Sequence, residues 1–251
     1  MADCFEKYYY NINDFALNPT VDKTYSVLQA ILGDLVAATN TSTLHIGGDE
    51  VVYGCWAEDE SIVLFMQQNG IASYDALLGY FIEKAQSIVS SFGAKPIHWE
   101  EVYNAWVKAP FTLSDDTIFQ VWHDESLITK IANDNYSVIA SPSKVWYLDH
   151  TDNTWQKMYA FDPAVNLTSS ANIGYLLGGE AVMFGEHIDD TNLQSVVFPR
   201  AAAVGERLWS PQNVTDIDDA LARLLDMRCR MVQRGFSAMP IEPGFCAVHY
   251  V

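Results

Sequence analysis

The chain has 251 residues, of which 49% are hydrophobic and 18% are charged, and its formal net charge at pH 7 is -18. This is the composition of a folded globular protein with a sizeable core, so it excludes a disordered chain. The negative charge argues against binding to nucleic-acid phosphates and to anionic membrane surfaces.

Four stretches have the 3.6-residue spacing of apolar side chains that predicts amphipathic helices. The first covers residues 25–36, and the second covers residues 77–92 and is ended by Gly93. Pro199 opens a third helix that runs to Trp209. The fourth spans residues 221–231 and ends near Gly235.

Short apolar runs alternate with these helices and predict strands at residues 43–46, 96–99, 117–122, 138–141 and 173–177. Such alternation predicts a parallel sheet whose strands are buried on both faces. In a (β/α)8 TIM barrel, functional residues lie where the strands end. Aromatic and acidic residues follow each predicted strand here. That combination suits sugars, because rings stack on pyranose faces and carboxylates bind hydroxyls.

The strongest motif is HIGGDE at residues 45–50, at the end of the first predicted strand. Two glycines let backbone and ligand approach closely. The adjacent carboxylates of Asp49 and Glu50 follow, and like charges side by side favour a proton on one of them, as a general acid requires. Taken alone, the segment is more simply interpreted as a turn that carries solvated acids.

Further blocks accompany this motif: CW at 55–56, HWEE at 98–101, QVW at 120–122, VWYL at 145–148, GGEAVMFGE at 178–186, PRA at 199–201 and GERLWS at 205–210. In this order they resemble the catalytic domain of the family 20 glycoside hydrolases, the β-N-acetylhexosaminidases. The likeness is strongest to the animal and protist lysosomal-type enzymes. It covers nearly the whole chain.

The resemblance implies a retaining, substrate-assisted mechanism, in which the substrate's own 2-acetamido oxygen attacks the anomeric carbon and forms an oxazolinium intermediate. It implies that Glu50 is the acid/base, that Asp49 holds the acetamido group and stabilises its charge, and that Tyr147 donates to the acetamido oxygen. The implied substrate is a glycan that ends in a non-reducing β-linked GlcNAc or GalNAc.

The resemblance also implies which residues enclose the sugar. Asp149 and Glu186 would bind its distal hydroxyls. Phe184 replaces a tryptophan usual in the family, which keeps an apolar wall but loses the indole N–H. The remaining walls would be Trp99, Trp122 and Trp146. A lone tryptophan at a strand end is more often a core residue, so these assignments rest on the ordered likeness.

We expect no metal and no cofactor, because His98, His123 and His150 lack the spacing of metal ligands. The four cysteines contain no C-x-x-C motif, and their spacing alone leaves both free thiols and two disulfides open. The resemblance pairs Cys4 with Cys55 and Cys229 with Cys246.

Disulfides imply an oxidising compartment, and the resemblance implies a lysosomal or secreted full-length protein that forms a homodimer. The first seven residues show neither the basic nor the apolar region of a signal peptide, and no run is long enough to span a membrane. Glycosylation sequons begin at Asn40, Asn135, Asn166 and Asn213, although a polar chain of this length carries a few by chance.

Parts of the family pattern are missing from the sequence. A full barrel needs eight strands, whereas five are predicted here. The arginine of the family's first strand, the Pro-Gly-His segment of its third strand and its N-terminal accessory domain do not appear. Residues 1–251 are therefore interpreted as a partial catalytic barrel, about strands 4–8 with C-terminal helices and a tail.

Two alternatives stay open. One is a truncated, catalytically impaired sugar-binding fragment or pseudoenzyme of the same family. The other is a retaining glycosidase with a protein nucleophile, which requires a second carboxylate about 5–5.5 Å from Glu50.

Overall fold

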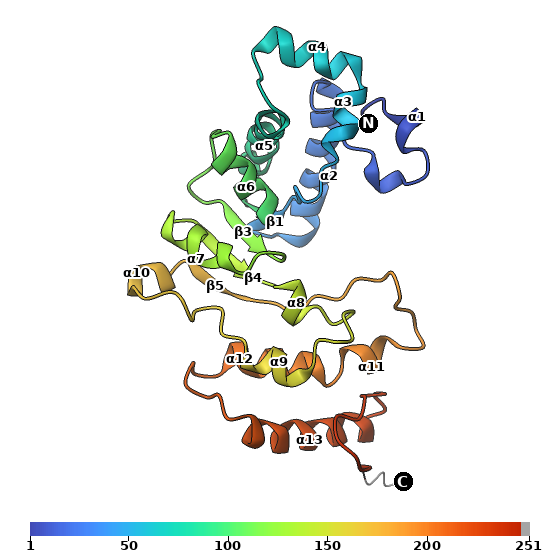
Figure 1. The fold of residues 1–251 in the computed structure, drawn as a ribbon, viewed down its shortest axis with the longest axis vertical. Coiled ribbons are helices and arrows are strands. Elements are labelled where there is room, and N and C mark those ends of the chain that lie inside the picture. The colour runs from blue at the N-terminus through green and yellow to red at the C-terminus, as the bar shows by residue number, and fades with distance from the viewer. Residues whose placement is uncertain (247–251) are drawn as a thin grey trace. The chain divides into compact units, whose positions relative to one another are not determined.

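The computed structural model of the protein describes residues 1–246, which divide into two compact units (Figure 1). The first unit comprises residues 1–120 and 134–137, and the second comprises residues 121–133 and those from 138 on. Within the described residues the sheet has five strands, and their order in the sheet is their order in the chain. The predicted parallel α/β arrangement is confirmed.

The first unit holds the strands β1 (Thr43–His45), β2 (Lys95–Trp99) and, except for its last residue, β3 (Ile118–Val121). Its helices are α1 (Phe5–Tyr8), the 3-10 helix η1 (Ile12–Asp14), α2 (Asp22–Thr39), α3 (Tyr53–Glu58), α4 (Glu60–Asn69), α5 (Tyr74–Ser91) and α6 (Glu100–Lys108). Strand β1 pairs in parallel with β2, and β2 pairs in parallel with β3.

Helix α5 has more buried residues than α6, with seven against four, and it forms where its apolar spacing predicts. Ser73 caps it by accepting the Ala76 N–H, and Gly93 follows it with a φ of 73°. Burial of a large aliphatic side chain contributes about 1.5–3 kcal/mol, so this face anchors the unit. The buried apolar side chains are Leu77, Leu78, Ile82, Ala85 and Val89.

Helix α2 also forms where predicted, but its apolar face is only partly covered. Leu32 is buried in a cluster with Val89 and Ala94. In contrast, Ile31 is 53% exposed and Leu35 is 44% exposed. Helix α5 packs beside α2 (Figure 1). It covers only part of the apolar face of α2 that the sequence predicts. The periodicity therefore predicted the helix correctly and overestimated its burial.

Both predicted disulfides are present. Cys4 is bonded to Cys55 and joins the N-terminal segment to α3, and Cys229 is bonded to Cys246. The bonds close loops of 51 and 17 residues. By the loop-entropy relation they contribute about 4 and about 3 kcal/mol to the free energy of unfolding.

The second unit holds β4 (Ser137–Ala140), except for its first residue, and β5 (Leu176–Gly179), and these two strands are parallel. Its helices are α7 (Ser126–Asn133), α8 (Ser143–Trp146), α9 (Trp155–Ala160), α10 (Ser170–Ile173), α11 (Leu193–Val197), α12 (Arg200–Trp209) and α13 (Ile217–Gln233).

The strand predicted at residues 173–177 lies further along the chain than expected. The Ser169 side chain accepts the Asn172 N–H and caps the short helix α10, which ends at Ile173. Strand β5 then begins at Leu176 and extends through the glycines to Gly179. A local capping bond, which apolar spacing does not reveal, decided the boundary.

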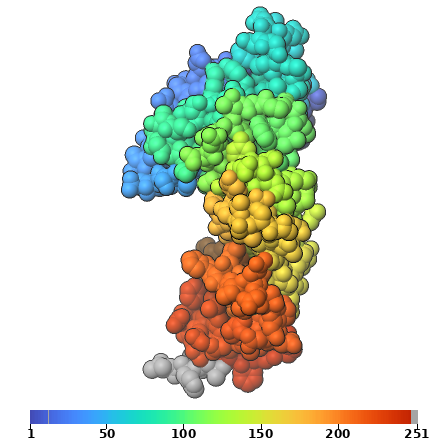
Figure 2. All heavy atoms as spheres, turned by 90° about the vertical axis from the view of Figure 1, so that its left-hand side faces the viewer, coloured from blue at the N-terminus to red at the C-terminus, as the bar shows by residue number. Residues whose placement is uncertain are grey.

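Helices α9, α12 and α13 form the core of the second unit around Trp155, Tyr159, Ala203, Ala220 and Leu224. The atoms of α12 and α13, orange and red, form one packed block in Figure 2. The helices begin and end close to the positions that Pro199, Trp209 and Gly235 predict.

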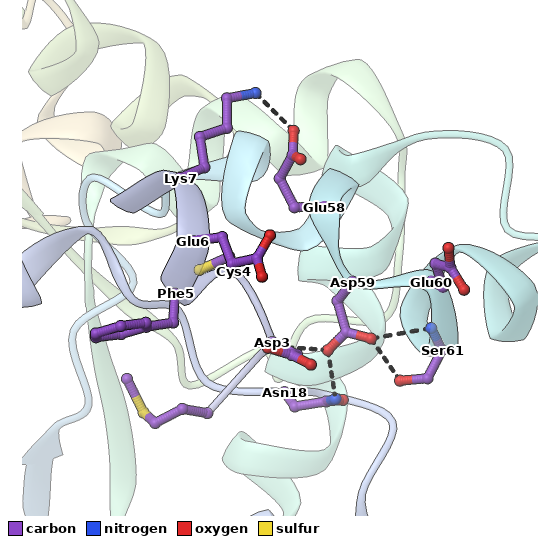
Figure 3. A pocket seen from close by; sticks show the side chains of 11 residues that line it. Asp3, Cys4, Phe5, Glu6, Lys7, Asn18, Glu58, Asp59, Glu60 and Ser61 are labelled. Atoms are coloured by element: carbon purple, nitrogen blue, oxygen red, sulfur yellow. Dashed lines mark hydrogen bonds and ion pairs between the residues drawn. The ribbon is translucent and has the colours of Figure 1, made fainter. Parts of the chain in front are cut away.

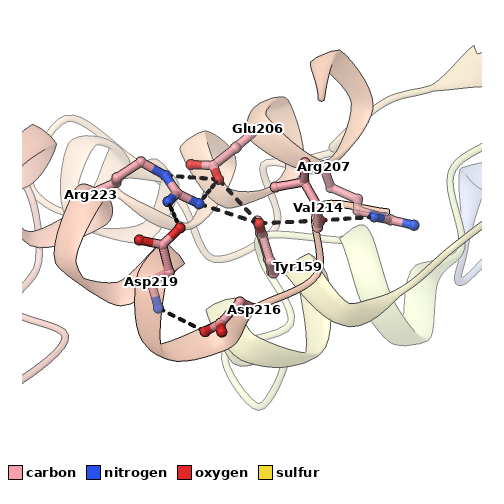
Figure 4. Close-up of polar contacts among 7 residues, drawn as sticks. All are labelled: Tyr159, Glu206, Arg207, Val214, Asp216, Asp219 and Arg223. Atoms are coloured by element: carbon pink, nitrogen blue, oxygen red, sulfur yellow. Dashed lines mark hydrogen bonds and ion pairs between the residues drawn. The ribbon is translucent and has the colours of Figure 1, made fainter. Parts of the chain in front are cut away.

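A polar network on these helices explains the GERLWS block (Figure 4). Glu206 accepts from the Tyr159 hydroxyl at 3.2 Å and pairs with Arg223 at 2.5 Å. Arg223 also pairs with Asp219. Arg207 is buried and donates to the backbone carbonyls of Phe161, Gln212 and Val214. The block therefore fixes the helices of the second unit to one another.

Candidate active site

The end of β1 places the acidic pair at the carboxyl end of the strand. Pairing with β2 continues beyond His45, because the Ile46 N–H donates to the Ile97 carbonyl at 2.9 Å. The Trp99 N–H then donates to the Gly47 carbonyl at 3.1 Å. These bonds fix the point at which the chain leaves the sheet.

The two glycines of the motif form the exit turn. Gly47 has a φ of 71° and Gly48 a φ of 105°, which residues with side chains rarely adopt. A Cβ on Gly48 would also lie 2.3 Å from Cγ2 of Val102. Both backbone conformation and packing therefore require glycine at residue 48.

Asp49 and Glu50 follow this turn, and both are exposed. Glu50 has a φ of 45°, a left-handed conformation that costs a residue with a side chain about 1–3 kcal/mol and is concentrated at functional sites. Glu50 lines two cavities. One, of about 270 Å³, also has Asp49 and Trp56 in its wall, and the other, of about 230 Å³, has Glu101 and Lys108.

Two histidines contact the same turn. The Nδ1 of His45 accepts the Gly47 N–H at 3.1 Å, and its ring centroid lies 4.8 Å from that of Trp99. His98 is fully buried, and its Nδ1 lies 3.3 Å from the Gly47 carbonyl oxygen. Burial lowers the pKa of His98 from 6.5 to about 4, so its imidazole is neutral at neutral and mildly acidic pH.

This buried histidine predicts a loss of stability in acid. Unfolded His98 takes up a proton near pH 6.5, and folded His98 does so only near pH 4, so stability falls as the pH falls through that interval. The pKa difference corresponds to about 3 kcal/mol. Urea unfolding gives the free energy of unfolding at pH 7 and at pH 4. Its decrease between these pH values should be about 3 kcal/mol larger in the native protein than in His98→Leu. Equal drops would contradict the shifted pKa.

In the second unit, Tyr147 lies in a row of aromatic side chains. Its ring stacks on that of Trp122 with 6.3 Å between centroids, and it lies 5.5 Å from the ring of Phe184. Tyr147 is 5% exposed and Phe184 is 43% exposed. The structure thus brings Tyr147, predicted to donate to the acetamido oxygen, beside two of the side chains predicted as walls of the sugar pocket.

Asp149 and Glu186, the carboxylates predicted to bind sugar hydroxyls, each follow an aromatic residue of this row by two positions. Their surroundings differ. Asp149 Oδ1 accepts the Phe184 N–H at 3.2 Å, and its Oδ2 lies 3.9 Å from Nε2 of His150. Its side chain is 18% exposed. Glu186 is exposed and follows Phe184 by two residues.

Arg200 holds the loop that carries Tyr147 and Asp149, although sequence analysis gave this arginine no role. It is 4% exposed. Burial lowers the pKa of its guanidinium, and the carboxylates of Asp149 and Asp152 act against that shift. The PRA block was the one sequence signal for it. Its guanidinium donates to the carbonyls of Leu148, His150, Asn153 and Val196.

Trp146, predicted as a wall of the sugar pocket, is a core residue in the structure. It is fully buried, its Nε1 donates to the Met158 carbonyl at 3.0 Å, and its ring meets Phe161 edge-on. A Cβ on Gly179 would lie 2.4 Å from its ring. The prediction took Trp146 for a strand-end residue, whereas β4 ends at Ala140 and Trp146 ends α8.

A cavity of about 720 Å³ in the first unit has a different character (Figure 3). Its wall includes Cys4, and Lys7 pairs there with Glu58 at 2.6 Å. The buried carboxylate of Asp59 accepts the Asp3 N–H at 2.8 Å. The described lining contains none of the residues predicted to contact substrate, and these bonds attach the N-terminal segment to the end of α3 and the start of α4.

Within residues 1–246, no group of three or more His, Cys, Asp or Glu side chains is arranged to hold a metal ion. Nor does any helix there combine the length and apolarity that a membrane span needs.

The sequence matches a known family along most of its length. Residues 2–212 match the catalytic domain of glycosyl hydrolase family 20. The chain is 36% identical over 236 residues to the human β-hexosaminidase subunit beta, and 34% identical over 238 residues to the rat subunit alpha. These matches cover 92% of the chain but only 41% and 44% of the two relatives. The chain thus spans less than half the length of these curated relatives.

Solved structures share the fold. The chitobiase of Flavobacterium johnsoniae superposes with a TM-score of 0.79 at 26% identity, over 88% of this chain and 34% of that one. The exo-β-N-acetylglucosaminidase of Vibrio harveyi, solved in complex with N-acetylglucosamine, gives 0.80 at 23% identity, over 90% and 37%. The extent of the family match and the identity to the β-hexosaminidase subunits show that the chain belongs to glycoside hydrolase family 20.

Proposed function

We propose that the protein is a β-N-acetylhexosaminidase, which removes terminal non-reducing β-linked GlcNAc or GalNAc from glycans. The observation that carries the proposal is the acidic pair Asp49-Glu50, held by a glycine-built turn at the carboxyl end of β1 in a family 20 catalytic domain. The aromatic row of Trp122, Tyr147 and Phe184 supports it, because stacked rings suit the apolar faces of a pyranose.

The proposed mechanism retains the anomeric configuration and uses the acetamido group of the substrate as nucleophile. The acetamido oxygen attacks the anomeric carbon as the glycosidic bond breaks, and Glu50 gives its proton to the leaving oxygen. Glu50 then takes a proton from water, which attacks the anomeric carbon and reopens the oxazolinium ring. Asp49 holds the acetamido N–H and stabilises its positive charge, and Tyr147 donates to the acetamido oxygen.

The remaining roles concern binding of the sugar. Trp99 and Trp122 provide apolar walls, and Phe184 provides a third without the hydrogen-bond donor of an indole. Asp149 and Glu186 accept from the distal hydroxyls.

Turnover of a chromogenic aryl β-GlcNAc glycoside tests this function. Release of the chromophore by the whole protein, lost on Glu50→Gln, would support a hexosaminidase. Binding of GlcNAc without any turnover would instead support the alternative of a catalytically impaired sugar-binding protein.

We also propose that residues 1–251 form part of a family 20 barrel, about strands 4–8 with terminal helices. The sheet within residues 1–246 has five strands, whereas a closed barrel has eight, and the chain covers only 34% and 37% of the two solved relatives; both observations support this. An open sheet would leave apolar strand edges exposed, so residues 1–251 expressed alone should be poorly soluble and nearly inactive. A soluble, cooperatively unfolding monomer with full turnover would contradict the proposal.

The two disulfides support action of the whole protein in an oxidising compartment, the lysosome or the cell exterior. As in the lysosomal-type enzymes that the sequence resembles, we propose a homodimer. Sedimentation of the protein purified from its native source would test the assembly.

The charge of Asp149 leads to a prediction about substrate preference. In the proposed complex this carboxylate lies near the 6-position of the sugar and repels a 6-sulfate, so neutral GlcNAc should be hydrolysed faster than its 6-sulfated analogue. Asp149→Asn should narrow the difference in kcat/KM between the neutral and the 6-sulfated substrate. The measurement is kcat/KM for the two aryl glycosides, and faster hydrolysis of the sulfated one would refute the placement.

A further inference from the structure

The buried histidine that contacts the catalytic turn has no part in the mechanism above. We propose that His98 is a positioning residue, which fixes the Gly47 peptide through its Nδ1–H and so sets the place from which Asp49 and Glu50 act. The inference rests on the proposed function, because the residues positioned are the proposed acid/base and its partner.

His98 reaches the turn from the helix-covered face of β2. Side chains alternate along a strand, and here Trp99 is half-buried on one face while His98 is fully buried on the other. The His98 Nδ1 lies 3.3 Å from the Gly47 carbonyl oxygen. That oxygen also accepts the Trp99 N–H at 3.1 Å. The Gly47 peptide is thus held by two donors from adjacent residues, one of the backbone and one of a side chain.

The bond to Gly47 determines the state of the imidazole. A carbonyl oxygen only accepts, so Nδ1 must carry the hydrogen, and burial keeps the ring neutral. Nε2 is then an acceptor, and it has no hydrogen-bond partner within the described part of the chain. An unpaired buried acceptor destabilises the folded state, and an apolar side chain would avoid that cost. The bond to Gly47 is what His98 provides and an apolar residue could not.

The turn needs such a restraint because of its backbone. Gly47, Gly48 and Glu50 all have positive φ, at 71°, 105° and 45°. A Cβ built on Gly48 would lie within 3.8 Å of both His98 Nδ1 and Ile82 Cδ1, so His98 is part of the surface on which the turn rests. Rotation of the Gly47 peptide would displace both carboxylates, and a displacement of about 1 Å can cost ~100-fold in rate.

Two substitutions separate the hydrogen bond from packing. His98→Leu fills similar space without a donor, and His98→Asn places an amide N–H near the position of Nδ1. In the whole protein, we expect His98→Leu to lower kcat about ten- to hundredfold with little change in KM, and His98→Asn to recover most of the loss. The loss should be larger on a poor leaving group than on a nitrophenyl glycoside, because delivery of the Glu50 proton is disturbed.

Val89→Ala is the control for general loosening of the core, since Val89 is fully buried in a cluster with Leu32 and Ala94. At a temperature where all variants are folded, this control should keep the native kcat. Native kcat in His98→Leu, or equal loss in His98→Leu and His98→Asn, would overturn the positioning role. These two outcomes can be distinguished from failure of the proposed function. In that case the unsubstituted protein would show no turnover that depends on Glu50.

Discussion

In the whole protein, Glu50→Gln is expected to lower kcat about 10²–10⁴-fold on glycosides with poor leaving groups. The amide keeps the shape of the side chain but can neither give a proton to the leaving oxygen nor take one from water. A nitrophenolate needs little protonation to depart, so the first step on a nitrophenyl glycoside should suffer less. The measurement is kcat for both substrates, with the first step followed in the pre-steady state.

Glu58→Gln is a matched control, because Glu58 is a surface glutamate that pairs with Lys7. It should leave both rates unchanged. Equal losses on the good and the poor leaving group in Glu50→Gln would argue against general acid catalysis by this residue.

Asp49→Asn is expected to lower kcat on acetamido substrates about 10²–10³-fold. Asparagine can still accept the acetamido N–H, but it lacks the negative charge that stabilises the developing oxazolinium. Because that charge develops after binding, the loss should appear in kcat more than in KM.

Asp116→Asn offers the corresponding control, since Asp116 is an exposed carboxylate paired with Lys95. A native kcat in Asp49→Asn would show that the acetamido charge is stabilised elsewhere or does not form. Loss of the same size in Asp116→Asn would mean that the effect is one of net charge.

The sequence predicted those elements whose local signals are strong. Helix α5 has seven buried residues at helical spacing, a serine cap and a terminal glycine, so each local signal agrees with the structure. Strand β5 began later than predicted because the cap at Ser169 created a helical turn first. The exposure of Ile31 on α2 depends on what packs against the helix, which periodicity does not specify.

Some residues of the candidate site could likewise be predicted from local sequence, and others could not. Asp49 and Glu50 could be recognised from contiguous sequence, because the two glycines and the two carboxylates are neighbours. The contact of His98 with Gly47 spans 51 residues and that of Arg200 with His150 spans 50 residues, and such pairs leave no local pattern. Trp146 was predicted to lie at a strand end and to contact the sugar. In the structure it ends α8 and is buried in the core.

The most direct measurement compares two glycosides with the same nitrophenyl leaving group, one of β-GlcNAc and one of β-glucose. The glucoside lacks the acetamido oxygen that is the nucleophile in the proposed mechanism, so we expect the whole protein to hydrolyse the first and to leave the second intact. Hydrolysis of both at similar rates, with a sugar trapped covalently on a carboxylate of the protein, would contradict substrate-assisted catalysis.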